Sequence, residues 1–317
     1  MGTVHFLNVG DGDCSVIKHL SDNITVIDIC NGNDDSVTKA YESLSLQGNY
    51  NQKAHPVNPI KYIQDLNITY INRFILTHPD MDHMDGIKRL FSEFKMGNLW
   101  DTDNNKTIDR SDFGSYKSED WDFYQKRRKE KNTLFLLDGA TGKYFNRDDQ
   151  GYGGDNLQIF CPTQELIEEA NRNGNYNDAS YVILYNENGK KILFAGDSED
   201  REWDVLLDNH EIDLRNIDVL IAPHHGRKSG GNNDFLDVLR PKITLFGNAD
   251  CKDLNYNAWN YRNLRHYTNN EGGTFIFQHN YLGNSIDLFC TYETFARKVN
   301  YNTYFNTSLN AWYIESF

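Results

Sequence analysis

Short apolar runs recur along this chain of 317 residues, and most of them end in turns rich in Gly, Pro, Asn or Asp. Runs of this length between turn residues are typical of strands. Stretches with apolar residues three or four positions apart separate several of these runs, and that spacing is typical of a helix face. We expect strands at residues 4–9, 14–18, 24–29, 74–76, 157–161, 181–185, 191–195, 219–222, 243–247, 274–278 and 285–290. We expect helices at residues 35–45, 85–95, 119–130, 164–171, 199–208 and 232–239.

The order of these elements indicates the class of fold. Strands with interspersed helices are typical of a layered α/β protein. The turn Asn186-Glu187-Asn188-Gly189 lies between two strands and predicts a hairpin, because turns of the Asn-Gly type favour that connection. Residues 96–155 are less regular, and residues 147–155 have the Asp- and Gly-rich composition of a loop. The pattern therefore predicts one α/β domain that carries an irregular insert.

Membrane and export signals are not evident in the pattern. No apolar run approaches the roughly 18 residues that a membrane-spanning helix needs. Residues 1–7 enter strand-like sequence without the charged and apolar segments of a signal peptide. The five cysteines (Cys14, Cys30, Cys161, Cys251 and Cys290) are odd in number and lack metal-finger spacing, which favours reduced thiols. We expect a cytoplasmic protein with no membrane contact.

The charge balance limits the choice of partners. The formal net charge is −14, from 46 acidic and 32 basic residues. Such a surface is not built to hold duplex nucleic acid through phosphate contacts alone. Divalent cations at a site would invert the local field, so a nucleic-acid substrate is not excluded.

The densest candidate chemistry lies in the hexapeptide His78-Pro79-Asp80-Met81-Asp82-His83. It follows the apolar run at 74–76 and precedes a stretch with apolar residues at helical spacing. Four metal-ligand side chains therefore occupy a short turn at the C-terminal end of a strand, where α/β proteins place their sites. Groups so close together repel one another unless a cation neutralises them. The alternative is a polar loop with two solvated histidines.

Two further strand ends carry similar side chains. Asp197 follows the strand at 191–195, and His224 and His225 follow the strand at 219–222. Each lies in a turn that contains Gly or Pro. Three turns of this kind at three strand ends favour one shared site over a chance distribution.

These motifs resemble the metallo-β-lactamase fold superfamily, whose signature is an HxHxDH loop, a later Gly-Asp after a strand and a late His. This chain has HxDxDH, with Asp80 at the second His position, which resembles the hydrolase domain of DNA-internalisation competence proteins. The turn at 9–14 resembles the "VGQGD" opening of that branch, and Asn177-Asp178-Ala179-Ser180 resembles its "NxxS" motif. The resemblance covers about residues 3–278 and implies a four-layer αββα sandwich. We expect residues 1–278 to form this domain, with an insert at about 100–155, and residues 279–317 to form a C-terminal extension that packs on it.

The resemblance implies two metal positions and a set of ligands. His78 and Asp80 would hold one cation; Asp82, His83 and His225 (or His224) would hold the other, with Asp197 bridging. The superfamily's middle His is absent, and Asn177 offers only a weak oxygen ligand in its region. One or two divalent ions are therefore expected, Zn²⁺ or Mn²⁺, since carboxylate-rich sites favour harder ions.

The implied activity is hydrolysis of phosphodiester bonds by a metal-activated water, with a nuclease as the leading version. Asp82 is the candidate to orient the water and take its proton, and the spare histidine of the pair His224 and His225 can contact a substrate oxygen or protonate the leaving group. One alternative is hydrolysis of small phosphodiesters or cyclic nucleotides. Another, from a different class, is an effector subunit that works with a protein partner encoded nearby, as in a defence system against foreign DNA.

Several other residues have two interpretations. For Asp28 we favour a supporting role beside the metal ligands over a role as a ligand. For the turn that contains Gly10 and Gly12 we favour a plain hairpin turn over a loop that binds phosphate. The run Lys126-Arg127-Arg128-Lys129 favours a solvated helix face over a nucleic-acid contact. The other assignments are Ser180 as a supporting residue, Arg227 and Lys228 as possible phosphate contacts, and His266 and His279 as surface residues.

Overall fold

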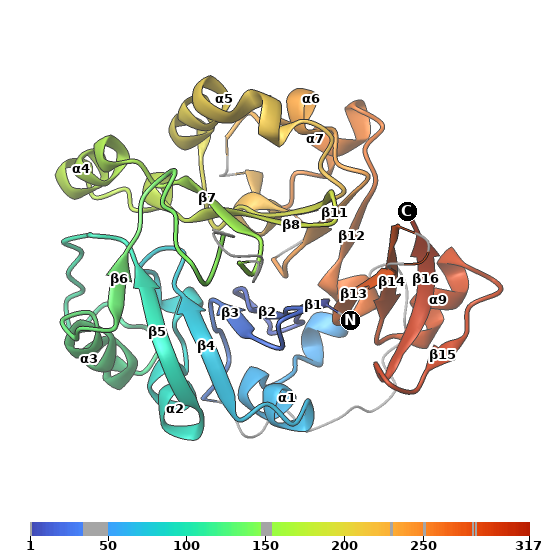
Figure 1. The fold of residues 1–317 in the computed structure, drawn as a ribbon, viewed down its shortest axis with the longest axis horizontal. Coiled ribbons are helices and arrows are strands. Elements are labelled where there is room, and N and C mark those ends of the chain that lie inside the picture. The colour runs from blue at the N-terminus through green and yellow to red at the C-terminus, as the bar shows by residue number, and fades with distance from the viewer. Residues whose placement is uncertain are drawn as a thin grey trace.

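The structure is a computed structural model that describes residues 2–33, 50–146, 154–228, 231–249, 252–280, 282 and 284–317. Two β-sheets face each other between helices (Figure 1). In the described residues the larger sheet has ten strands, in the order β15 (Phe305–Asn306), β16 (Ala311–Ser316), β14 (Ser285–Cys290), β13 (Phe275–Asn280), β1 (Thr3–Phe6), β2 (Ser15–Lys18), β3 (Ile24–Ile27), β4 (Tyr70–Ile75), β5 (Lys95–Asp101) and β6 (Thr133–Phe135). The described part of the smaller sheet has six strands, in the order β12 (His266–Thr268), β11 (Ile243–Phe246), β10 (Val219–Ile221), β9 (Lys190–Phe194), β8 (Val182–Glu187) and β7 (Leu157–Cys161).

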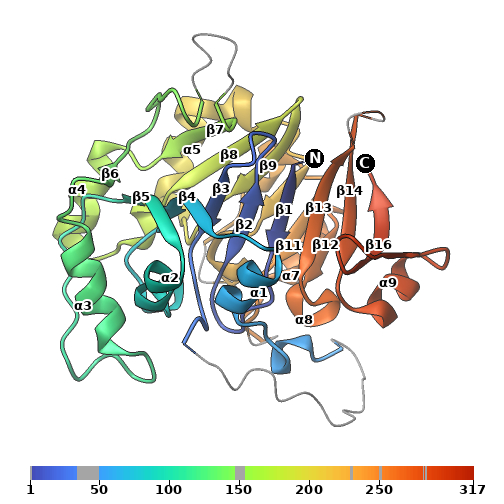
Figure 2. The ribbon, with the colours of Figure 1, turned by 60° about the horizontal axis from the view of Figure 1, so that its bottom comes forward.

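Helices cover the outer face of each sheet. Figure 2 shows α1 (Pro59–Asp65) and α2 (Ile87–Glu93) in front of the larger sheet, with α3 (Ser118–Arg127) beside them. The outer side of the smaller sheet carries α4 (Gln164–Asn173), α5 (Asp200–Leu214), α6 (Leu236–Leu239) and α7 (Tyr256–Tyr261). The short helices α8 (Asn269–Gly272) and α9 (Glu293–Val299) lie near the C-terminal strands. No helix of the described ranges is long and apolar enough to cross a membrane.

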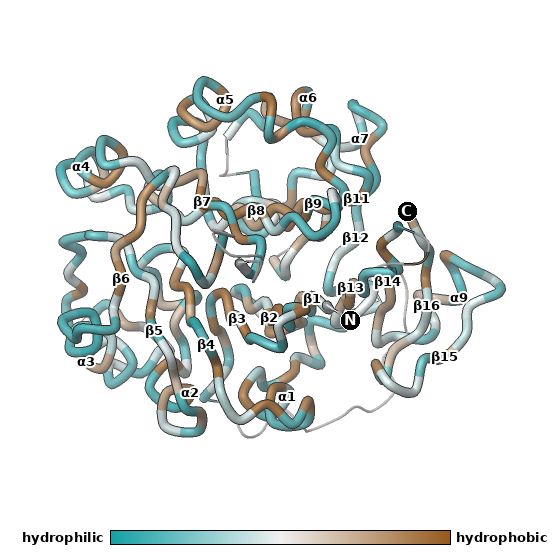
Figure 3. The backbone as a smooth tube through the Cα atoms, viewed as in Figure 1, coloured by the Kyte–Doolittle hydropathy of each residue, from teal (hydrophilic) through white to brown (hydrophobic). Residues whose placement is uncertain are grey.

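Alternation along the strands divides the core into layers. In β8, Ile183 and Tyr185 face the larger sheet, whereas Val182 and Leu184 pack under the outer helices. The larger sheet alternates in the same way, with Ile75 turned inward and Phe74 turned toward its helices. Figure 3 shows hydrophobic residues concentrated on the strands of both sheets. The predicted four-layer α/β sandwich is confirmed.

Most expected elements are present, but α1, α7, α8, α9, β12, β15 and β16 were not among them. Residues 96–155, expected to be irregular, contain β5 and β6. The helix expected at 232–239 forms only as α6, over its last residues. The helix expected at 35–45 lies outside the described residues. In β5, Gly97 allows a close approach to β4, because a Cβ there would lie 2.2 Å from the backbone oxygen of Asn72.

The C-terminal strands extend the larger sheet. β13 pairs antiparallel with β1 on one side and with β14 on the other. β16 then pairs with β14, and the short β15 forms the edge. Residues before and after position 278 therefore belong to one continuous sheet. Helix α9 inserts Phe295 and Ala296 into the core between the sheets.

Parallel pairing brings the functional turns together. β4 pairs parallel with β3 and β5, and β10 pairs parallel with β9 and β11. The carboxyl ends of parallel strands lie at the same edge of a sheet. The turns after β3, β4, β9 and β10 thus reach one end of the sandwich, where the turn between β1 and β2 also lies.

Candidate metal centre

Four imidazole nitrogens surround one buried carboxylate at this end of the sandwich. The carboxylate belongs to Asp197, which is 4% exposed and follows β9. Its oxygens lie 3.9 Å from Nε2 of His78, 3.3 Å from Nε2 of His83, 3.6 Å from Nε2 of His224 and 3.8 Å from Nε2 of His225. The structure therefore brings the three turns singled out in the sequence to a common point.

The other ring nitrogen of each histidine faces an oxygen of the protein. The Nδ1 pairs are His78 with Thr77 Oγ1 (3.2 Å), His83 with Asp28 (2.9 Å), His224 with Glu199 (3.5 Å) and His225 with Asp13 (3.1 Å). Partners of this kind fix the ring orientation and direct Nε2 toward a metal. All four rings are therefore arranged to present Nε2 at the same place.

Asp28 lies beside the ligands in the supporting position. One of its oxygens accepts a hydrogen bond from the backbone N–H of Thr77 (2.8 Å), and the other accepts one from the Thr77 hydroxyl (2.7 Å). The second oxygen also faces Nδ1 of His83. Because Asp28 follows β3 and Thr77 follows the neighbouring β4, the sheet itself positions this contact.

The backbone around the site is strained where the side chains converge. His224 and His225 have φ values of 48° and 56°, in the left-handed region that non-glycine residues rarely adopt. Gly196 has φ 53°, and a Cβ there would lie 3.0 Å from the side chain of Ser180. The hydroxyl of Ser180 accepts a hydrogen bond from the backbone N–H of Asp197 (3.3 Å). Strain of this kind is concentrated at functional sites.

Buried polar atoms at the centre make no hydrogen bond with the described residues. They include Nε2 of His78, His83 and His225 and Oδ1 of Asp197. Nδ1 of His224 and His225 and Oδ1 of Asp13 also make no hydrogen bond there, so their contacts are charge contacts only. An unsatisfied buried polar atom is costly, and a cation would satisfy the three Nε2 atoms and the Asp197 oxygen. Three groups of ligand atoms lie within 4.8 Å of one another: His78, His83 and Asp197; Asp82, His83 and His225; and Asp13, Asp197 and His225. Imidazole and carboxylate donors suit divalent ions such as Zn²⁺ and Mn²⁺, so the residues fit the expected cofactor.

The electrostatics of the site also attract positive charge. Burial favours the neutral form of His225, but Asp13 and Asp197 outweigh it and raise its pKa to about 10. Burial likewise opposes a charge on His83, yet Asp197, Asp28 and Asp82 raise its pKa well above the usual value. Asp197 is also buried, but the surrounding histidines hold its pKa well below the usual range. The carboxylates thus create a field that a bound cation would neutralise.

The two acids of the hexapeptide have different surroundings. Asp82 has an oxygen 3.6 Å from Nε2 of His225 and 3.9 Å from Nε2 of His83, so it faces the cluster. Asp80 instead accepts a hydrogen bond from the ammonium group of Lys106, and it belongs to none of the three ligand groups found in the described residues. Its nearest site contact is His78 Nε2, at 3.8 Å.

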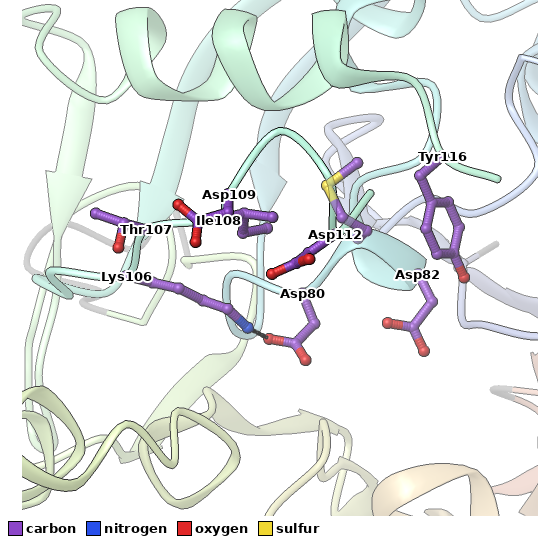
Figure 4. Close-up of a pocket in the computed structure, with 9 residues that line it drawn as sticks. Asp80, Asp82, Lys106, Thr107, Ile108, Asp109, Asp112 and Tyr116 are labelled. Atoms are coloured by element: carbon purple, nitrogen blue, oxygen red, sulfur yellow. Dashed lines mark hydrogen bonds and ion pairs between the residues drawn. The ribbon is translucent and has the colours of Figure 1, made fainter. Parts of the chain in front are cut away.

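A pocket opens beside these two acids (Figure 4). Its volume is about 450 Å³, the size of a small-molecule site. Asp80 and Asp82 form one wall, and the segment from Lys106 to Tyr116, which follows β5, forms the other. Asp109 and Asp112 add two exposed carboxylates to that wall, so the pocket lining carries four carboxylates and one ammonium group.

The remaining sequence candidates lie around the cluster. The side-chain amide of Asn177 donates to Glu199 (3.2 Å), the carboxylate that faces His224. Lys228 is exposed and its ammonium donates to the backbone oxygen of Lys252 (2.7 Å). Arg227 forms a backbone bridge with Leu254. The structure thus places Asn177 in support of His224. Arg227 contacts the cluster through its backbone N–H, which donates to the backbone oxygen of His224 (2.9 Å). Among the described residues, no hydrogen bond or ion pair joins the side chain of Arg227 or Lys228 to the cluster.

Besides Thr77, which directly precedes the hexapeptide, three contributors were not singled out from the sequence: Asp13, Glu199 and Lys106. Asp13 lay within a motif used only for the family resemblance, in the tight turn between β1 and β2. The other two follow β9 and β5 in ordinary polar segments, and they reach the site only through the fold.

Asp13 provides a first test of the geometry. Asp13→Asn should lower the affinity for Mn²⁺ or Zn²⁺ about 10- to 100-fold, as loss of a partner that orients a metal ligand usually does. Asp11→Asn, an exposed acid in the same turn, should leave the affinity unchanged. Isothermal titration calorimetry would measure both values, and equal affinities for the two variants would exclude an orienting role for Asp13.

The basic run on α3 has a structural role that was not foreseen. Arg128 forms an ion pair with the buried Asp101 (3.0 Å) and donates to the backbone oxygen of Thr102 (2.9 Å). Arg127 pairs with Glu130 and lies over the ring of Phe91, 5.0 Å from its centroid. The expectation of a solvated helix face is therefore wrong for these two arginines.

Comparisons with known proteins yield distant structural neighbours. No protein-family model and no curated protein matches the chain. A metal-dependent hydrolase of the β-lactamase superfamily aligns with a TM-score of 0.45 and 11% identity, over 86% of this chain and 98% of that one. A diphosphatase of the PhnP family aligns with a TM-score of 0.40 and 11% identity, over 78% and 86%.

A third neighbour has a different stated activity. The diiron β-hydroxylase CmlA from Streptomyces venezuelae aligns with a TM-score of 0.42 and 14% identity, over 77% of this chain. The chain spans less than half of that protein, 44% of its length. At these identities and TM-scores the neighbours carry no function across to this chain. Its relation to the competence-protein branch stays a prediction.

Proposed function

We propose that the protein is a metal-dependent hydrolase of the metallo-β-lactamase type that cleaves phosphodiester bonds. The observation that carries this proposal is the convergence of four imidazole Nε2 atoms on the carboxylate of Asp197. Each imidazole has its Nδ1 within 3.5 Å of a protein oxygen, and three of the Nε2 atoms are buried without a hydrogen bond among the described residues. Such a cluster is built for a cation and not for packing.

The ligand set follows from the distances. Asp82, His83 and His225 would hold one ion, with Asp197 as a shared ligand. His78 also faces Asp197 and lies next to His83, with 4.2 Å between the ring centroids. When bound, a divalent cation supplies an acidified water and draws electron density from a phosphoryl oxygen.

The chain's own residues supply the proton transfers. Asp82 is half-buried and lines the pocket, so its carboxylate can orient a water and accept its proton. His224 is positioned to donate a proton to the leaving oxygen, because Glu199 holds its Nδ1 and Asn177 holds Glu199. The layers on either side keep the rest of the cluster away from solvent.

The substrate class has two versions. Nucleic acid is the version that the family resemblance favours, and we propose a nuclease first. The pocket favours the second version, a small phosphodiester or cyclic nucleotide, because it has small-molecule size and a small substrate needs no extended basic track. The arginines of the α3 run contact the protein itself, which reduces the basic surface left for a nucleic-acid track.

A model substrate tests the reaction and a panel tests the substrate. Bis-p-nitrophenyl phosphate should be hydrolysed with Mn²⁺ or Zn²⁺ present and not with EDTA, because the cluster depends on its cation. Single-stranded DNA, duplex DNA, RNA and cyclic nucleotides, assayed under the same conditions, would separate the two versions. Much faster cleavage of a β-lactam or a thioester than of any phosphodiester would contradict the proposal.

A further inference from the structure

The ammonium group of Lys106 lies beside His78 and Asp80, the residues predicted to hold the first metal ion. It donates to Asp80 Oδ1 (Figure 4). The same oxygen lies 3.8 Å from Nε2 of His78. His78 and Asp80 are the two residues expected to hold the first ion. A positive charge of the protein therefore already pairs with Asp80, one of the two residues expected to hold that ion.

Lys106 is held in place by the surrounding loop. Its backbone N–H donates to the side chain of Asn104 (3.2 Å), which in turn bonds the hydroxyl of Tyr124 (2.9 Å). Its ammonium lies 5.4 Å from the ring centroid of Tyr176, and its side chain is only 20% exposed. The Tyr176 hydroxyl bonds the neighbouring Asn105 (2.7 Å), which fixes the loop against η4 (Asn177–Ala179). These contacts hold the Lys106 side chain in one place, unlike the side chain of an exposed surface lysine.

The two metal positions are unequal. The second has three ligands of its own, Asp82, His83 and His225, within 4.8 Å of one another. Of the ligands expected for the first position alone, only His78 is left once Asp80 is paired with Lys106, because the amide of Asn177 is directed to Glu199. The group of His78, His83 and Asp197 is complete only through His83, which the second position also uses. A divalent cation at the first position would also be repelled by the ammonium group beside it.

We infer that Lys106 replaces one cation of a two-metal site. The chain then binds a single ion at Asp82, His83 and His225, with Asp197 as a shared ligand. The ammonium group lines the pocket next to that ion, where it can contact an anionic oxygen of the substrate. This inference rests on the proposed metal site. It specifies that the site binds one metal ion per chain and that the Lys106 ammonium group provides the second positive charge.

Metal counting tests the inference without any assay of activity. The protein is dialysed to equilibrium against Mn²⁺, and the bound ion is measured by elemental analysis. The wild type should bind one ion per chain. Lys106→Met keeps the length of the side chain but removes the charge, frees Asp80 and should bind two ions, the number typical of two-metal hydrolases.

Three controls identify the cause of a second ion. Lys106→Arg retains a cation and should bind one ion. Adding Asp80→Asn to Lys106→Met removes the freed ligand and should return the count to one. Lys129→Met changes an exposed lysine and should also bind one. Circular dichroism of each variant would verify that it is folded.

The possible failures are distinguishable. Two ions in the wild type, or one ion in folded Lys106→Met, would overturn the role of Lys106 and leave the proposed hydrolase intact. No bound ion in the wild type would overturn the proposed function itself.

Discussion

Asp197→Asn is expected to lose both its bound metal and its hydrolytic activity. The amide has the size of the carboxylate, but it removes the charge that faces all four histidines. We expect hydrolysis of bis-p-nitrophenyl phosphate to fall at least about a thousandfold, or roughly 4 kcal/mol of transition-state stabilisation. Elemental analysis of the same samples would relate the loss of rate to the loss of metal.

Asp204 provides the matched control for this variant. It lies on α5, a few residues beyond Asp197, and is exposed. Asp204→Asn should keep wild-type metal content and rate. A folded Asp197→Asn variant that retains full metal content would show that Asp197 is not a shared ligand of the ion.

Arg128→Met is expected to destabilise the fold strongly. Arg128 is the ionic partner of Asp101, which is fully buried and also accepts a hydrogen bond from the hydroxyl of Tyr124 (2.9 Å). Removing one partner of a buried ion pair leaves an uncompensated charge and typically costs about 3 to 5 kcal/mol. Urea denaturation would measure the loss. Lys126→Met, an exposed change on the same helix, should alter the free energy of unfolding by less than about 0.5 kcal/mol.

The loss in Arg128→Met should depend on pH in a defined direction. Burial raises the pKa of Asp101 from its usual value to about 7, although Arg128 and Tyr124 oppose the shift. A carboxyl with a raised folded-state pKa stabilises the fold at low pH and loses that contribution as pH rises through the folded value. Without Arg128 the charged form is less favourable still. The destabilisation should therefore be small near pH 5 and large near pH 8, and an equal loss at both values would argue against an uncompensated charge.

Local sequence was sufficient to predict the helices and strands whose own residues carry a turn motif or a regular apolar pattern. The hairpin of β8 and β9 follows from the turn at 186–189, and the alternation seen in β8 follows from its two buried faces. β5 was not predicted because Gly97 and Asn98 interrupt its apolar pattern, and it becomes a strand only through its pairing with β4. His279, expected at the surface, is 2% exposed in the larger sheet, because β13 is covered by neighbouring strands and the opposite layer.

The candidate site divides in the same way. Turns that carry several ligand side chains together, as residues 78–83 do, are recognisable without a fold. Asp13, Glu199 and Lys106 each contribute a single group, and each acts on a histidine or an acid that is distant in the chain or on a separate turn. Their contacts exist only after the two sheets have packed. For that reason the sequence motif could not predict the charge of Lys106 beside Asp80. Taken by itself, the motif indicated a metal ion at Asp80.

The most direct test of the central claim is an anomalous difference map from crystals grown with Mn²⁺. The imidazole nitrogens and carboxylates of the cluster should then coordinate the metal. The account predicts a peak at bonding distance from His83, His225, Asp82 and Asp197. A protein that binds Mn²⁺ at another place, or a map without a peak at these residues at saturating Mn²⁺, would contradict it.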